Sequence, residues 1–78
     1  MAEAIAVPFK WIVKIQFGNA YITKANEEFS VVGVAPLRYI DDNHKWVAGK
    51  SKEKIFKSLV EAVRAINEAE VGGNSSIG

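Results

Sequence analysis

The side chains best suited to chemistry lie in one short run, Asp41-Asp42-Asn43-His44. Carboxylate, amide and imidazole groups bind divalent cations and move protons. A cation, however, needs ligands that converge from several directions, and four consecutive residues at a turn rarely do so. We therefore interpret the run as a polar turn, and we expect no metal site and no cofactor.

Few side chains of this sequence suit catalysis. His44 is the single histidine, the chain has no cysteine, and no nucleophile pattern lies beside it. General-base catalysis would therefore rest on one isolated, exposed group. We expect this protein not to be an enzyme and to have no catalytic residue.

The run Ala48-Gly49-Lys50-Ser51 is similar to the end of a phosphate-binding loop. The earlier glycine of that motif would fall at position 44, which is His44, and 78 residues cannot hold the nucleotide fold around it. A strand-ending glycine followed by an N-cap serine is the better interpretation. Free N–H groups at such a helix start, beside Lys50 and neighbouring lysines, still favour an anion such as a nucleic-acid phosphate.

Residues 9–17 alternate with a period of two, which predicts a strand with one apolar face. The apolar face is Phe9, Trp11, Val13, Ile15 and Phe17, and the other face is Lys10, Ile12, Lys14 and Gln16. Pro8 precedes the strand, and residues 1–7 are expected to be loosely ordered.

Gly18-Asn19 predicts a two-residue hairpin turn, after which residues 20–25 pair back. That register places Gln16 opposite Tyr21, Lys14 opposite Thr23, and Phe17 opposite Ala20. After a polar loop at 26–28, residues 29–35 are apolar at both odd and even positions and are expected to form a central strand. Gly33 and Pro36 predict a bulge or bend.

Residues 37–40 either continue that strand or form a fourth one, and a turn at 41–44 would pair Tyr39 with Trp46 and Arg38 with Val47. Ser51 is the expected N-cap of a helix over residues 51–69, with a tail at 71–78. Its apolar stripe is Ile55, Phe56, Leu59, Val60, Ala62, Val63 and Ile66. The expected fold is α+β: a single domain, 1–78, with an antiparallel sheet of four or five strands over residues 8–49 and one C-terminal helix packed on one face.

The polar face of this sheet offers a binding surface. Cations for phosphates and flat rings for bases are what single-stranded nucleic acid requires. The candidate residues on the sheet are Lys10, Lys14 and Tyr21, with Arg38 and Lys45 as further members. A solvated face is the alternative. Ile12 in its middle indicates a face covered by a ligand or a second subunit. The pair Tyr39 and Trp46 suits either core packing or a binding hot spot.

The segment from Arg38 to Lys50, followed by a helix, resembles the end of the sheet in the positive-cofactor-four family of single-stranded DNA-binding coactivators. The resemblance covers less than half of the chain, and the family's glycine-containing strand between the turn at Gly49-Lys50 and the helix is absent here. It implies a fold of four antiparallel strands and one helix. It also implies DNA contacts by Arg38, Lys45, Trp46 and Lys50.

Composition limits the remaining possibilities. Ten Lys and Arg against nine Asp and Glu give a net charge of +1, so any basic surface is local. No apolar run approaches the roughly 20 residues that span a bilayer, and without cysteine there is no disulfide. We find no targeting signal and expect a cytoplasmic protein, in the host cytoplasm if it is viral.

A chain this short has a thin core, so we expect its stability to be shared in a homodimer. The expected function is that of a small binding module for single-stranded nucleic acid. The rival is a small protein-binding inhibitor or adaptor, of which a viral protein would be one example. It would act through the sheet face or edge, with Ile12, Tyr21 and Tyr39 as contacts.

Overall fold

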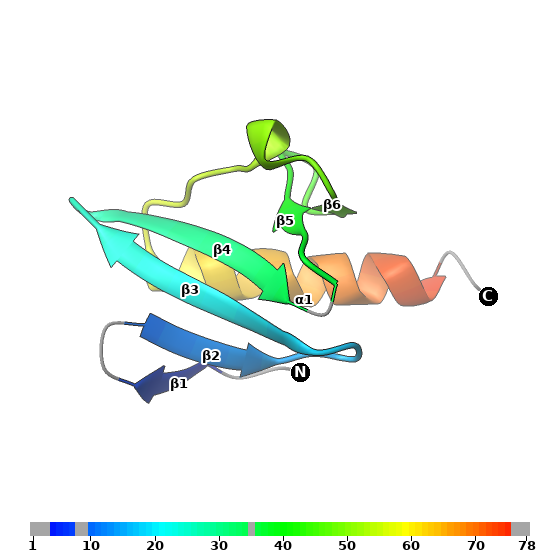
Figure 1. Cartoon of the computed structure of the whole chain (residues 1–78), viewed down its shortest axis with the longest axis horizontal. Helices are drawn as coiled ribbons and strands as arrows, with labels where there is room; N and C mark the ends of the chain where they lie inside the picture. The colour runs from blue at the N-terminus through cyan, green and yellow to red at the C-terminus, as the bar shows by residue number, and fades with distance from the viewer. Residues whose placement is uncertain (1–3, 8–9, 35, 76–78) are drawn as a thin grey trace.

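The computed structural model describes residues 4–7, 10–34 and 36–75, with the side chain of Val7 and those beyond Val71 left out. It has the α+β architecture that the sequence predicts (Figure 1). Four antiparallel strands lie in the order β1-β2-β3-β4, a two-stranded hairpin β5-β6 follows, and the C-terminal helix α1 contacts β3, β4 and β5. The elements are β1 Ala4–Val7, β2 Lys10–Lys14, β3 Asn19–Ala25, β4 Glu28–Val34, β5 Tyr39–Ile40, β6 Trp46–Val47, a 3-10 helix Lys50–Lys52, and α1 Leu59–Ser75.

The amino-terminal segment forms a strand, so the expectation of a loose lead over residues 1–7 was wrong for its described part. β1 pairs with β2, with Ile5 opposite Ile12 and Ala6 opposite Trp11. Short uncharged side chains let this segment extend the sheet and satisfy the backbone of β2 on its outer side. Pro8 and Phe9 lie outside the described residues.

The β2–β3 register differs from the predicted one. Ile12 pairs with Tyr21 and Lys14 with Asn19, so the connection is a loop over residues 15–18 instead of a two-residue turn. Gly18 has φ 86°, a value that favours glycine. The shift moves each pairing by an even number of residues, which preserves the predicted faces of β2 and β3. Phe17 is the exception, because it lies in the loop and is 67% exposed.

The β3–β4 connection is a two-residue turn at Asn26-Glu27, both with positive φ (52° and 64°), as in a type I′ hairpin turn. Glu28 therefore belongs to β4. This strand lies at the end of the sheet, not in its centre. Its apolar character at both parities is explained by what covers its outer edge: Phe29 exchanges backbone hydrogen bonds with Phe56, and Gly33 with Arg38.

The β5–β6 hairpin is shifted by one residue from the prediction. Tyr39 pairs with Val47 and Ile40 with Trp46, so the predicted Tyr39–Trp46 pair does not form. Asp41 causes the longer loop, because its Oδ1 accepts hydrogen bonds from the backbone N–H of Asn43 and of Lys45. With a side-chain period of two, a one-residue shift reverses the faces, and Ile40 is buried in the core.

Helix α1 begins at Leu59, eight residues after the predicted start, and continues to Ser75 instead of ending at 69. Residues 53–57 are not helical because Phe56, only 2% exposed, is bound by its backbone to Phe29. Ser58 is the actual cap: its Oγ accepts the backbone N–H of Glu61 at 3.2 Å. No helix among the described residues is long and apolar enough to cross a membrane.

The core lies between the sheet and α1. Its largest fully buried side chains are Val13, Ile22, Val31, Ile40, Phe56 and Ile66. The helix contributes Ile66 and three alanines, Ala62, Ala65 and Ala69. Of the predicted stripe, Leu59 and Val63 are half-buried against this core, whereas Val60 is 66% exposed. Small side chains on the inner face bring the helix close to the sheet.

Candidate functional site

The sheet has one face that α1 does not cover, and we call it the open face. Buried residues Val13, Ala20, Ile22 and Val31 lie on the side of α1. Because successive side chains of a strand alternate, their neighbours lie on the other side, away from the helix. In Figure 1 the helix crosses behind β3 and β4, which leaves this side of the strands uncovered.

A row of apolar side chains crosses the middle of the open face. Ile5 pairs with Ile12, Ile12 with Tyr21, and Tyr21 with Val32, so the four residues occupy matching positions on β1, β2, β3 and β4. Ile5 is 53% exposed, and the other three are half-buried. We call these four residues the apolar row. It spans the full width of the sheet.

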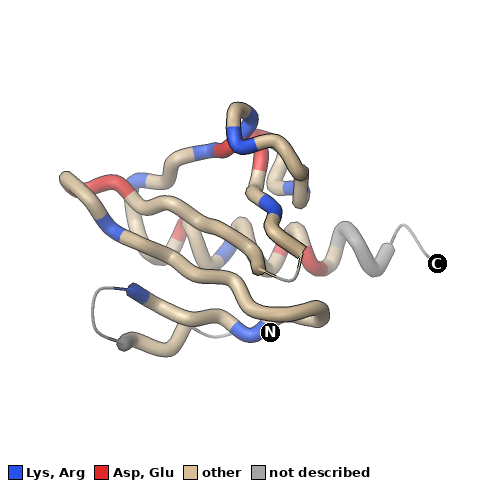
Figure 2. Tube along the Cα trace, viewed as in Figure 1, with Lys and Arg blue, Asp and Glu red and all other residues tan. Residues whose placement is uncertain are grey.

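Mainly polar residues border the apolar row on both sides, and Val34, opposite Asn19, is an apolar exception. Lys10, Thr23 and Ser30 pair across one side, and Lys14 pairs with Asn19 on the other. Lys10 and Lys14 begin and end β2, as the basic segments of Figure 2 show. The Nζ of Lys10 lies 4.6 Å from the centre of the Tyr21 ring, a cation–π contact. The open face therefore has an apolar centre with a mainly polar rim that includes two lysines.

Arg38 and Trp46 lie on the opposite side of the sheet, next to Gly33. A Cβ on Gly33 would lie 2.9 Å from Cγ of Arg38 and 3.0 Å from Cζ3 of Trp46, so both side chains pack over this glycine. The Arg38 guanidinium stacks 4.6 Å from the Trp46 ring and donates to the carbonyl oxygens of Pro36 and Phe17, each at 2.8 Å. These contacts hold the β5–β6 hairpin on the sheet.

The other predicted contacts lie on the segment that carries this hairpin. Lys45 is exposed beside β6. Nζ of Lys50 lies 3.9 Å from Oε2 of Glu53 and 5.9 Å from the ring of Tyr39. The structure thus brings Lys10, Ile12, Lys14 and Tyr21 together on the open face. It places Arg38, Tyr39, Lys45, Trp46 and Lys50 on a separate part of the molecule.

The anion site expected at a helix start after Gly49 does not form, because no α-helix begins there. The segment is a 3-10 turn in which the N–H of Lys52 donates to Gly49 and that of Glu53 to Lys50. Lys54 is 3.9 Å from Asp42, a weak exposed ion pair. This stretch is a connection between β6 and Phe56.

His44 has a structural partner. Its Nδ1 is 3.0 Å from Oε1 of Glu68 on α1, and its ring centre is 6.0 Å from that of Phe56. Glu70 makes a second link, accepting the Trp46 indole N–H at 3.1 Å and the Gln16 backbone N–H at 2.7 Å. Together these carboxylates tie the hairpin and the β2–β3 loop to the helix. Among the described residues, no three or more His, Asp or Glu side chains form a group that could hold a metal ion.

Sequence reasoning missed Ile5 and Val32, the two outer members of the apolar row. Ile5 was missed because β1 was interpreted as an unstructured lead. Val32 was missed because residues 29–35 are apolar at both odd and even positions, so the sequence does not show which side chains face away from the core. An Ala-Ile-Ala-Val run just before a strand could have indicated β1.

Comparison with known proteins found no matching family model, no similar curated protein and no similar solved structure. The resemblance to the positive-cofactor-four family therefore rests only on the segment from Arg38 to Lys50.

Proposed function

We propose that this protein is a non-enzymatic binding module that binds a protein partner through the open face of its sheet. The observation that carries the proposal is the apolar row, four matched positions that cross every strand of the sheet. A row with Ile5 half exposed is more apolar than a solvated face needs to be. An apolar centre with a polar rim is the common anatomy of a protein interface.

The rim indicates the chemistry of the partner. Lys10 and Lys14 flank the apolar row, and among the described residues no acidic residue pairs directly with either of them in the sheet. A partner surface with apolar side chains at its centre and carboxylates around them would complement this face. Such rim charges act mainly on the association rate and on specificity.

The test is affinity capture from the cells that encode the protein, with Ile12→Lys as the disrupting variant. Ile55→Lys is the matched control, because Ile55 is an isoleucine at the surface (38% exposed) that lies outside the four-stranded sheet. We expect one partner to be recovered stoichiometrically with wild type and with Ile55→Lys, and to be lost with Ile12→Lys. Circular dichroism must show that both variants are folded. Recovery of the same proteins with Ile12→Lys as with wild type would contradict the proposal.

Single-stranded nucleic acid is the second candidate, favoured by the stacking of Lys10 on Tyr21 beside Lys14. We place it second because, in the part of the sheet that the structure describes, the open face offers only these two lysines. Each phosphate contact on a single strand contributes about −0.7 to the slope of log K against log salt, so two contacts give about −1.4, or roughly a sevenfold loss from 50 to 200 mM salt.

This candidate has its own measurement, the binding of a labelled single-stranded oligonucleotide at several salt concentrations. We expect Lys14→Glu to abolish any binding, whereas Lys52→Glu, an exposed lysine on the 3-10 helix, should leave it unchanged. If no binding is seen at low salt, nucleic acid is excluded as the ligand of this face.

A further inference from the structure

Helix α1 has a second apolar side, which faces away from the sheet. We call it the outer face; it is lined by Leu59, Val60, Val63, Arg64, Asn67, Glu68 and Val71. At about 100° per residue, Val60 and Val71 lie roughly opposite the buried alanines. They are 66% and 65% exposed, respectively.

The exposed side of α1 carries larger apolar side chains than a helix with a single partner layer requires. The inner face has Ile66 and three alanines, Ala62, Ala65 and Ala69, and Leu59 and Val63 are half-buried at its margin, whereas Val60 and Val71 lie exposed on the outer face. Valine forms helices less readily than alanine, so helix formation alone does not explain these residues. Buried against a partner, each exposed valine would add to the stability of a complex.

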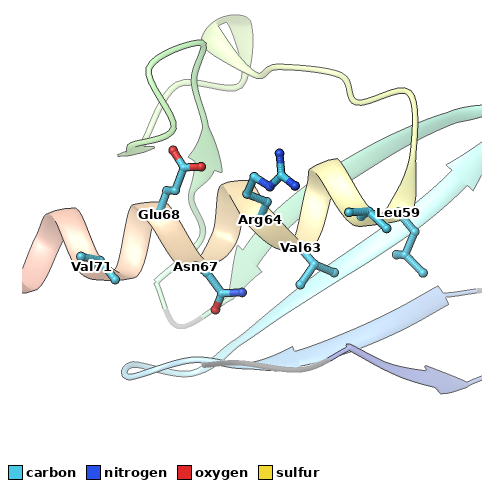
Figure 3. A pocket seen from close by; sticks show the side chains of 7 residues that line it. Leu59, Val63, Arg64, Asn67, Glu68 and Val71 are labelled. Carbon is cyan, nitrogen blue, oxygen red and sulfur yellow. The ribbon is translucent and has the colours of Figure 1, made fainter.

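The outer face also forms an open groove with a volume of about 870 Å³. Figure 3 shows Val63 and Asn67 pointing to one side of it, with Arg64 and Glu68 on the other side. The groove runs along the helix from Leu59 to Val71, more than three helical turns. Its length and its apolar floor suit another helix laid along it.

The two charges on this face show which helix fits. Arg64 and Glu68 are one turn apart, and no carboxylate of the described residues lies within ion-pair distance of Arg64. A second copy laid parallel about a two-fold axis would bring Arg64 against Arg64 and Glu68 against Glu68. A second copy laid antiparallel would instead pair each Arg64 with a Glu68, so the face is self-complementary in that orientation alone.

We propose that the outer face of α1 binds a second copy of this chain, with the two helices antiparallel about a two-fold axis that passes between Arg64 and Glu68. The same axis places Val60 and Val63 of one copy against Val71 of the other. Glu68 can keep its contact with His44, which uses Oε1, while Oε2 accepts from the second copy's Arg64. The open face lies on the other side of the molecule and remains free in each protomer.

The charge pair permits a sharp test by analytical ultracentrifugation of the full chain. Arg64→Glu gives a face with two carboxylates, and Glu68→Arg gives one with two guanidiniums. We expect wild type to dimerise and each single variant to dimerise at least about tenfold more weakly, because like charges then meet across the axis. An equimolar mixture of the two variants should recover the dimer, since opposite charges meet again in the heterodimer.

Val71→Lys should also give a monomer, and Lys52→Glu is the control for an unrelated change of charge. The proposal is overturned if wild type remains monomeric up to about 0.5 mM, or if the mixture associates no more strongly than either variant alone. A dimer that survives Val71→Lys would place the interface elsewhere. Circular dichroism of each variant separates loss of the dimer from loss of the fold, and Ile12→Lys should leave the dimer intact, so this test is independent of the proposed function.

Discussion

At the scale of single residues, Glu70 joins two segments that are distant in sequence to the helix. Its two carboxylate oxygens accept one backbone N–H from the β2–β3 loop and one indole N–H from β6. Three segments that are distant in sequence are thus tied by one half-buried side chain. Glu68, two residues earlier, accepts from His44 alone among the described residues.

We predict that Glu70→Gln lowers the free energy of unfolding by about 1 to 2 kcal/mol, because an amide has a single acceptor oxygen and leaves one of the two donors unpaired. Glu68→Gln is the matched control and should cost less, since the amide can still bond to the imidazole of His44. Urea unfolding of both variants measures the difference. Equal losses for the two would show that the Glu70 contacts carry no special weight.

At the scale of elements, the start of α1 shows where sequence reasoning fails. The sequence predicted Ser51 as the N-cap, and Ser58 was not considered. The structure selects Ser58 because Phe56 is held in an extended bridge with Phe29 and is buried in the core. A contact between residues 27 positions apart decides the helix boundary, and no local pattern contains that information.

Replacement of the two serines tests this assignment. Ser58→Ala removes the Oγ that accepts the N–H of Glu61, and we expect it to lower the free energy of unfolding by about 1 kcal/mol. Ser51→Ala should change stability by no more than a few tenths of that value, because Ser51 is exposed on the 3-10 helix and caps no α-helix. Thermal and urea unfolding of the pair give the comparison. The reverse order of effects would return the helix start to Ser51.

The inward and outward faces of the strands were easier to predict than the register in which the strands pair. The alternation in residues 10–14 correctly separated Trp11 and Val13 from Lys10, Ile12 and Lys14, because a period of two is a local property. Pairing register is not local: it depends on loop lengths. The error at β2–β3 was even and kept the faces, whereas the error at β5–β6 was odd and reversed them.

The candidate site divides in the same way. Lys10, Ile12, Lys14 and Tyr21 could be placed together because they lie on adjacent strands joined by one short loop. Arg38 was added to this surface by its residue type and Trp46 was named only through the family resemblance. Nothing in their local sequence shows that they pack on the helix side, over Gly33. A sequence shows the chemistry of each side chain, but it does not show on which side of the sheet a distant hairpin packs.

At the scale of the whole molecule, the close approach at Gly33 joins the sheet to the hairpin. The backbone of Gly33 exchanges hydrogen bonds with Arg38 at 2.7 and 2.9 Å, and the Arg38–Trp46 stack covers it. The β5–β6 hairpin is therefore positioned by a site that has no room for a side chain.

We predict that Gly33→Ala lowers the free energy of unfolding by about 1 to 3 kcal/mol, because the added Cβ would lie 2.9 Å from Arg38 and 3.0 Å from Trp46. Gly49→Ala is the control, since a Cβ there would meet nothing closer than 3.8 Å. The displaced indole should also change the tryptophan emission spectrum of the folded protein. A Gly33→Ala variant as stable as wild type would mean that the hairpin shifts without cost.

The two backbone bridges on β4 carry a last implication. The chain leaves this strand after the Gly33–Arg38 bridge and rejoins it at the Phe29–Phe56 bridge. The segment between Arg38 and Phe56 is therefore fixed to β4 at both of its ends. Its exposed tip at Lys50–Lys52 is accordingly a natural acceptor for foreign peptides. An epitope or affinity tag inserted there should be displayed without disturbing the open face of the sheet or the outer face of α1, which makes the fold usable as a presentation scaffold.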